Sequence, residues 1–440
     1  MKTTQRSISD IIDADYKEFA MYTLEQRAIP SVIDGFKPVQ RKLLCSMLQE
    51  GGKKVKVAEL GGSLAKFSYH HGESSAMAAA IGLAADWSNN APLFQGHGSF
   101  GSRMIQEAAA PRYIYASLSD NYKKFFCDVE VAPPSKDAEN PEPSHYLPII
   151  PWVLVNEISG ISVGFKSSIL PRAVSDVVSA TKKCLKNPSK FLAENELILP
   201  TFPQFSGNVV SIGNNQYKTV GKIFATGRST YSITELPIGY DREGYINVLN
   251  SLIDSDKIKD YEDNCSSNGF GFTIKVSAAQ KIEIDKSPFT YFKLEKTHTE
   301  ILTTIGYDGK LKIFQSVAEL IHYFVQYRLE MVGKKLEYDI RQLEAKIQFN
   351  EDKAKFIQAI LNQEVDLRST TKAQLMTFIE GSITTQEHGK RFLAIPLYDC
   401  TKDAVQSLLD ALDGMYVELG ILKDSSPKDL FANKLAKLPK

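Results

Sequence analysis

Residues 19–47 read FAMYTLEQRAIPSVIDGFKPVQRKLLCSM, and this stretch decides how the N-terminal part of the chain folds. Apolar side chains recur at intervals of three or four residues on both sides of its centre, as in amphipathic helices. Between them, AIP (28–30) and DGFKP (34–38) carry the prolines and the glycine that end one helix and begin the next. The pattern predicts a compact helix-turn-helix unit whose helices present Met21, Leu24 and Ala28, and then Val39, Leu43, Leu44 and Met47.

Further along the chain the pattern changes from helical to mixed. Residues 95–102, QGHGSFGS, are predicted to form a loop or wing, because glycine is frequent in turns. Prolines cluster between residues 133 and 151, which predicts a linker or an extended crossing segment. After them, residues 158–163 and 269–276 are typical of strands and residues 245–252 of a helix. The chain is therefore expected to be an α+β multidomain protein.

From about residue 314 the apolar residues return to a helical spacing and keep it to Leu361. Such a run is long for a globular helix, so it predicts a coiled coil. Leu408, Leu412, Met415 and Leu419 repeat the spacing and are expected to form the returning helix. A buried helical hairpin is the alternative. Together the composition shifts predict three domains, at residues 1–148, 149–312 and 313–440.

Composition excludes several classes of protein. Among 440 residues, 43% are hydrophobic and 10% aromatic, which excludes disordered and collagen-like chains. The 52 basic and 52 acidic residues cancel, which argues against a protein that coats nucleic acid but allows a local basic groove. The longest small and apolar run, residues 76–85, falls short of the about 20 residues that span a bilayer. No signal peptide is visible, and five scattered cysteines are typical of reduced thiols in the cytosol.

Motifs for nucleotides and metals are weak. Gly96-x-Gly98-x-x-Gly101 matches the dinucleotide pattern, but no strand is expected before it and Pro111 interrupts the region after it. The P-loop pattern GxxxxGK[ST] does not occur in the sequence. Asp254-x-Asp256 is expected to be a solvated helix end. The adjacent histidines 70 and 71 diverge on regular structure, so a zinc site is not expected.

A polar cluster in the first 115 residues offers the remaining candidate chemistry. An arginine beside a tyrosine usually decorates a surface. The chemical alternative is a tyrosine that attacks a phosphodiester. A phenol has an ordinary pKa near 10, so it needs cationic neighbours and usually a metal ion to react at neutral pH. Arginine neutralises the non-bridging oxygens with its fork of donors. The cluster consists of Arg27, Lys37, Arg41, Lys66, His71, Arg112, Tyr113 and Tyr115.

The same residues resemble the breakage-reunion subunit of type IIA DNA topoisomerases. The resemblance begins with residues 19–30 and 34–41 and continues, in the order and spacing of the family, across nearly the whole chain. Its further motifs are YHHGE (69–73), GSFGS (98–102), AAAPRY (108–113), SGISVG (159–164), ITELP (233–237) and the long helix from Phe324 through Arg328.

The resemblance implies a role for each candidate residue. Tyr113 would form a 5′-phosphotyrosyl bond, and Arg112 would stabilise the scissile phosphate. Ile161 would insert between base steps and bend the DNA. The domains would be a winged-helix cleavage domain (1–148), a tower domain (149–312), and a coiled coil with a dimer gate (313–440). The residues expected to hold DNA beside the cut are Arg27, Lys37, Arg41, Lys66, His71 and Ser102.

The resemblance also implies partners and cofactors. Double-stranded DNA would be the substrate, two copies of the chain would pair through the C-terminal gate, and a partner subunit would bind Mg²⁺ and ATP. Without the C-terminal β-pinwheel of gyrase A proteins, the chain is most similar to the T-even bacteriophage group, which implies the host cytoplasm and no membrane. Arg172 stands where the family usually has histidine, for no reason visible in the sequence. A non-catalytic winged-helix and coiled-coil protein that organises DNA is the alternative.

Overall fold

The computed structural model describes residues 7–439 except 136–139, 268, 366–368, 384–388 and 397–399. The chain forms two compact units. The first comprises Met1–Arg328 and Ala432–Lys440, and the second comprises Leu329–Phe431. Helices and strands are mixed, which confirms the α+β class. None of the helices in the described ranges is long and apolar enough to cross a membrane.

The first unit opens with a helical segment that ends where the sequence predicts. Ile29 leaves the helix with an extended backbone and is followed by Pro30. The next helix, α3 (Pro38–Gln49), begins at a proline, and the Gln40 side chain accepts a 2.9 Å hydrogen bond from the Lys37 backbone N–H. The predicted helix-turn-helix is thereby confirmed. The segment consists of α1 (Ile8–Asp10), η1 (Ile11–Tyr16), α2 (Lys17–Thr23) and η2 (Leu24–Ala28).

A small sheet completes the N-terminal layer. It has the order β1-β3-β2 and is antiparallel, with β1 at Val55–Lys56, β3 at Tyr115–Leu118 and β2 at Phe94–His97. A loop or wing was predicted at residues 95–102, and the first part of this segment belongs to strand β2, where Gly96 pairs with Ala116 across the sheet. The helices beside it are α4 (Val57–Ser63), η3 (Leu64–Phe67) and α5 (Glu73–Ala84).

The proline-rich segment is packed rather than free. Tyr146, Leu147 and Ile150 are buried. The backbone of the segment is bound to the chain after α6 (Asp120–Phe125), since the Cys127 N–H donates to the Leu147 carbonyl. Of the two predictions, the described part shows an extended crossing segment. Two short helices flank it, η4 (Val129–Val131) and η5 (Trp152–Leu154).

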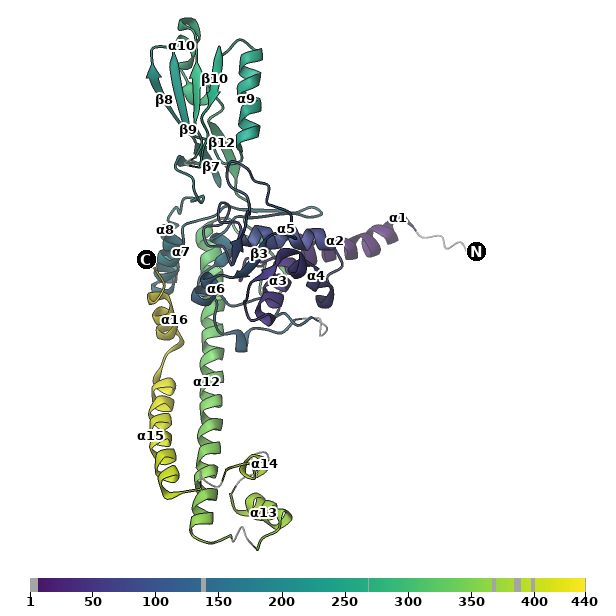
Figure 1. The fold of residues 1–440 in the computed structure, drawn as a ribbon, viewed down its shortest axis with the longest axis vertical. Coiled ribbons are helices and arrows are strands. Elements are labelled where there is room, and N and C mark those ends of the chain that lie inside the picture. Colours follow the sequence, from purple (N-terminus) through teal and green to yellow (C-terminus); the bar gives the residue numbers. More distant parts are fainter. Residues whose placement is uncertain are drawn as a thin grey trace, which may run out of the picture. The chain divides into compact units, whose positions relative to one another are not determined.

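Two sheets and their helices follow in the first unit (Figure 1). A hairpin of β4 (Ile158–Ile161) and β5 (Lys166–Ile169) comes first, then α7 (Val174–Lys186) and α8 (Pro188–Glu194). One sheet has the order β10-β11-β9-β8 and the other β12-β7-β6. The predicted strand at 269–276 and helix at 245–252 are confirmed as β11 and α9, which share one apolar core. The remaining bounds are β6 (Asn208–Gly213), β7 (Gln216–Val220), β8 (Lys222–Gly227), β9 (Thr230–Glu235), α9 (Arg242–Asp254), β10 (Asp260–Asp263), β11 (Phe272–Lys275), α10 (Ala278–Ile284), α11 (Pro288–Tyr291), β12 (Glu295–Thr299), β13 (Thr303–Ile305) and β14 (Leu311–Ile313).

The long helix α12 (Val317–Leu361) has 45 residues and carries the chain into the second unit. Within that unit the predicted returning helix is α15 (Lys402–Asp424), and Figure 1 shows it beside α12. Lys423 pairs with Glu344 at 2.7 Å and Tyr416 hydrogen-bonds Glu351, so the two helices are antiparallel. The remaining helices are α13 (Lys372–Phe378), η6 (Ile379–Ile383) and α14 (Gly389–Phe392), followed by α16 (Pro427–Ala436).

Candidate active site

Tyr113 stands on a turn whose backbone is fixed at several points. Its N–H donates to the Ala110 carbonyl at 2.9 Å, and the first residues of α4 bind the same segment through Val57 N–H to Ile114 O and Ala58 N–H to Pro111 O. The side chain is 67% exposed. The Arg112 guanidinium carbon lies 4.8 Å from the centre of the Tyr113 ring. The structure therefore presents a phenol to the surface on a rigid support, with a cation over its ring.

Tyr115 has a different environment. It belongs to β3 and is paired with Lys56 on one side and His97 on the other. Lys54 lies over its ring, with the ammonium 4.8 Å from the ring centre. This tyrosine is half-buried in the sheet. Of the two tyrosines, Tyr113 is the one that an external phosphate can approach.

Arg27 and His71 come together beside two tyrosines. Arg27 is exposed at the end of η2. The His71 Nε2 lies 3.3 Å from the Tyr22 hydroxyl. The ring centres of His71 and Tyr69 are 5.4 Å apart, and the two rings are nearly perpendicular. Burial and the nearby Arg27 charge lower the pKa of His71. Lys66 is also exposed, in the last turn of η3.

Lys37 and the strand that leads to Ile161 are also neighbours. Gly160 packs so closely that a Cβ there would lie 1.9 Å from the Ala28 carbonyl oxygen and 3.5 Å from the Lys37 Cε. Burial lowers the pKa of Lys37. One residue further, Ile161 ends β4 with 78% of its surface exposed. An exposed apolar side chain thus lies next in sequence to a glycine that packs against the helix end and a lysine.

Arg41 does not lie where the sequence analysis expected it. The residue is buried, and its guanidinium donates to both carboxylate oxygens of Asp34, at 2.9 and 3.1 Å, and to the Phe36 carbonyl. The expected contact with DNA phosphates does not fit this geometry, because the cation neutralises a fully buried carboxylate. Asp34 also accepts the backbone N–H groups of Phe36 and Tyr146. Arg41 therefore holds the turn before α3 in place.

Ser102 closes a tight turn before Tyr113. Its hydroxyl accepts the Ile105 N–H at 3.1 Å, and its own N–H donates to the Ile105 carbonyl at 2.7 Å. Between them lies Arg103, which no motif singled out and which is buried. Its carboxylate partner is Glu235 at the end of β9, far along the chain, so the sequence alone does not reveal this pair.

The unusual Arg172 is also explained by the fold. Its guanidinium donates to both oxygens of Glu300, at 2.8 and 2.7 Å, and to the Leu170 and Ile198 carbonyls. Both side chains are fully buried. Because Glu300 also accepts the Leu170 N–H, the pair anchors the chain just after β5. A buried glutamate at residue 300 makes arginine the fitting partner at residue 172.

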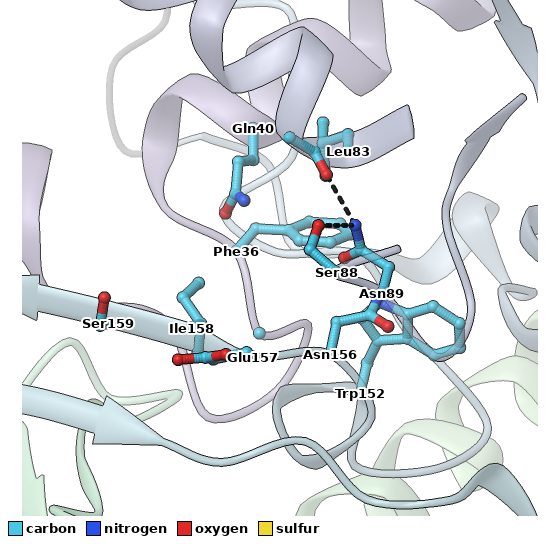
Figure 2. A pocket seen from close by; sticks show the side chains of 12 residues that line it. Phe36, Gln40, Leu83, Ser88, Asn89, Trp152, Asn156, Glu157, Ile158 and Ser159 are labelled. Atoms are coloured by element: carbon cyan, nitrogen blue, oxygen red, sulfur yellow. Dashed lines mark hydrogen bonds between the residues drawn. The ribbon is translucent and has the colours of Figure 1, made fainter. Parts of the chain in front are cut away.

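A cavity of about 270 Å³ lies beside the first residues of β4. Its wall combines the start of α3, the end of α5 and the residues around Trp152 (Figure 2). Figure 2 shows the Asn89 amide hydrogen-bonded to Ser88 at this wall. Ile158 and Ser159 of β4 also line the cavity. The cavity therefore lies at the start of β4, the strand that ends at Ile161.

Side chains that could bind a metal ion are dispersed over the described part of the chain. Among them, no group of three or more histidine, cysteine, aspartate or glutamate side chains is arranged to hold one.

Comparison with known proteins identifies the class. Residues 27–437 match the sequence profile of the A subunits of DNA gyrase and topoisomerase IV, and the chain belongs to this family of type II topoisomerase cleavage and religation proteins. It is 34% identical to the DNA topoisomerase medium subunit of Enterobacteria phage T4 over 93% of each chain. It is 31% identical to the mitochondrial DNA topoisomerase 2 of Dictyostelium discoideum, covering 98% of this chain but 35% of that protein.

The fold is also similar to a solved topoisomerase structure. The DNA-binding, cleavage and re-ligation domain of Plasmodium falciparum topoisomerase II superimposes with a TM-score of 0.87 and 28% sequence identity, covering 97% of this chain and 63% of that one. The family resemblance predicted from the motifs is confirmed. The chain spans nearly the full length of the phage relative and about a third of the length of the Dictyostelium enzyme.

Proposed function

We propose that this chain is the DNA-cleaving and religating subunit of an ATP-dependent type II DNA topoisomerase, with Tyr113 as its nucleophile. The observation that carries the proposal is the exposed Tyr113 phenol on an anchored turn, with the Arg112 guanidinium 4.8 Å from its ring centre. Family membership supports the reaction class.

In the proposed step, the Tyr113 oxygen attacks a backbone phosphorus of DNA. A bond forms between that oxygen and phosphorus, and the bond from phosphorus to the 3′ oxygen breaks. The phenol gives up its proton, the departing 3′ oxygen takes one up, and the 5′ phosphate stays on the tyrosine. Arg112 neutralises the non-bridging oxygens as charge builds on them. The reverse step reseals the strand, and no cofactor is consumed because one phosphodiester replaces another.

The surrounding residues would bind and bend the duplex. We propose that the region 1–148 acts as a winged-helix cleavage domain and 149–312 as a tower. Ile161 would enter the base stack, which costs a few kcal/mol of unstacking that further protein contacts offset. The remaining cations would contact phosphates, so that binding weakens with salt. The residues in this role are Arg27, Lys37, Lys66, His71 and, through its hydroxyl, Ser102.

Partners complete the proposed enzyme. One tyrosine cuts one strand, so a double-strand break requires two copies of the chain, paired by two-fold symmetry through the region 313–440. We assign Mg²⁺ and ATP to a partner subunit. By analogy with the phage T4 relative, the enzyme would act in the cytoplasm of a host cell. The reaction would relax or decatenate DNA by passing one duplex through the break.

The test is a trapped cleavage reaction. The chain is incubated with supercoiled plasmid, the partner subunit, Mg²⁺ and ATP, quenched with detergent and examined for protein-linked linear DNA. We expect linear product with wild type and with Tyr115→Phe, and none with Tyr113→Phe, although that variant should bind DNA normally. The chain without partner should give no linear product.

Two outcomes would contradict the proposal. Loss of cleavage in Tyr115→Phe with activity in Tyr113→Phe would place the nucleophile two residues away. DNA binding without covalent product under all conditions would favour the alternative, a non-catalytic protein that organises DNA.

A further inference from the structure

We infer that Arg103 is a positioning residue for the cleavage reaction: its ion pair with Glu235 ties the Tyr113 loop (residues 98–113) to the β8–β11 sheet and sets the place of the nucleophile. The inference rests on the proposed function, because positioning presupposes that Tyr113 reacts. Arg103 and Glu235 would act on the reaction through the position of Tyr113, without contacting the phosphate.

The Arg103 side chain extends from the Tyr113 loop to the end of β9. Its guanidinium donates to the Glu235 carboxylate at 2.8 Å, to the Gln204 carbonyl at 2.9 Å and to the Leu236 carbonyl at 3.1 Å. Two aromatic rings, Phe205 and Phe270, each lie 5.3 Å from the guanidinium carbon. The residue is 9% exposed. These contacts hold its side chain in one place.

Glu235 is built into its sheet as firmly as Arg103 is built into the loop. It is the last residue of β9 and is 4% exposed. Besides Arg103, its carboxylate accepts hydrogen bonds from the backbone and hydroxyl of Ser206 and from the Leu236 N–H. These donors hold the carboxylate in one orientation. It belongs to the ITELP motif, for which the sequence offered no role.

A second contact fastens the same tip of the loop. Met104 packs against the apolar core of the sheet, and its carbonyl accepts the Arg242 N–H at the start of α9. Arg103 and Met104 together thus attach the tip of the loop to the β8–β11 sheet. Ser102 and Ile105 close the turn on either side of these two residues.

The two arms of the loop are packed on each other, so the tip cannot shift alone. Gly101 has a φ of +85°, and a Cβ there would lie 2.9 Å from the Gln106 carbonyl oxygen. The Ala109 N–H donates to the Ser99 carbonyl at 3.0 Å. Four residues after Ala109 comes Tyr113. A shift of the β8–β11 sheet would therefore displace Tyr113.

The chemical consequence follows from the geometry that in-line attack requires. A misplacement of about 1 Å costs on the order of 100-fold in rate, even when substrate binding is unchanged. Loss of the ion pair leaves a buried charge without its partner and weakens the attachment of the loop tip to the sheet. The reaction step should suffer more than DNA affinity.

The experiment uses the complete enzyme, reconstituted with its partner, and compares Glu235→Gln with Asp128→Asn. Asp128 is an equally buried carboxylate with Arg328 and Lys434 as partners, and its ion pairs involve neither the loop nor the sheet. For each variant the thermal midpoint, the DNA dissociation constant, DNA bending by energy transfer, and the single-turnover rate of covalent complex formation are measured.

We expect Glu235→Gln to slow covalent complex formation about 10- to 100-fold, while DNA affinity and bending stay within about twofold. Asp128→Asn should lower the thermal midpoint comparably and leave the cleavage rate within about twofold. Glu235→Asp, which keeps the charge, should recover part of the rate and serves as the test variant if Glu235→Gln does not fold.

Three results would overturn the inference: a wild-type cleavage rate in a folded Glu235 variant, an equal loss of rate in Asp128→Asn, or a fall in DNA affinity that accounts for the loss of cleavage. Failure of the proposed function looks different, since wild-type enzyme would then form no covalent complex that depends on Tyr113.

Discussion

Arg112 and Lys37 are both cations near the candidate cut, but their surroundings differ. Arg112 is exposed over the Tyr113 ring, whereas Lys37 is half-buried beside Gly160. We expect Arg112→Ala to lower the cleavage rate by ~10²–10³ because it removes a stabiliser of the transition state. Lys37→Ala should mainly weaken DNA binding and reduce its dependence on salt. Single-turnover cleavage and binding measured over a salt series test this, and equal, salt-insensitive losses in both variants would contradict it.

His145 makes stability depend on pH in a defined window. Burial is the main cause that lowers its pKa to about 4, with a smaller effect of Arg41 and an opposing effect of Asp34. The unfolded chain binds a proton near the ordinary pKa of about 6.5 and the folded chain does not. The free energy of unfolding should therefore fall as pH decreases from about 6.5 to 4, by up to about 3 kcal/mol from this residue.

Denaturant unfolding at pH 7 and pH 4.5 checks this expectation. His145→Gln should lose less stability between the two pH values than wild type. His298, whose pKa is also lowered to about 4, contributes equally to both proteins and cancels. Asp128, with its pKa lowered to about 2, titrates below the window. The same loss in variant and wild type would show that His145 does not carry the effect.

The β4–β5 hairpin is the element that presents the predicted wedge. Because Ile161 is 78% exposed, its removal leaves no cavity in a core. We expect Ile161→Ala to reduce DNA bending, measured by energy transfer across a labelled duplex, with little change in the thermal midpoint. Normal bending together with a lower midpoint would mean that the side chain is structural.

Elements with local signals were predictable from sequence. The breakers around residues 28–38 gave the turn before α3, and the apolar repeat gave α12 and α15. For β2 the sequence predicted only a loop or wing, because this strand depends on its pairing with β3, for which there is no local signal.

Site residues divide in the same way. Motifs indicated Tyr113. No local signal, however, distinguishes the exposed Arg27 from Arg41, which is paired with the buried Asp34. Arg103 and Arg172 have carboxylate partners more than 100 positions away in sequence, 132 and 128 respectively. Such pairs follow from tertiary structure alone.

At the scale of the whole molecule, one carboxylate joins distant parts of the first unit. Asp128 pairs with Arg328 at 2.5 Å and with Lys434 at 2.7 Å. Arg328 is fully buried and Lys434 is partly exposed. We expect Asp128→Asn to cost about 3–5 kcal/mol, since Arg328 loses its counter-charge, and Lys434→Ala to cost about 1 kcal/mol. Urea unfolding measures both, and the reverse order would contradict the assignment.

The Asp128 cluster also makes the second unit an insertion. The second unit begins directly after Arg328 and ends three residues before Lys434. Both of these residues pair with Asp128, so the two ends of the inserted segment lie close together. Inserted modules with adjacent ends tolerate excision, because a short bridge can replace them without stretching the host. The first unit can thus be made as one polypeptide in which a glycine-serine bridge follows Arg328 and residues 432–439 are retained.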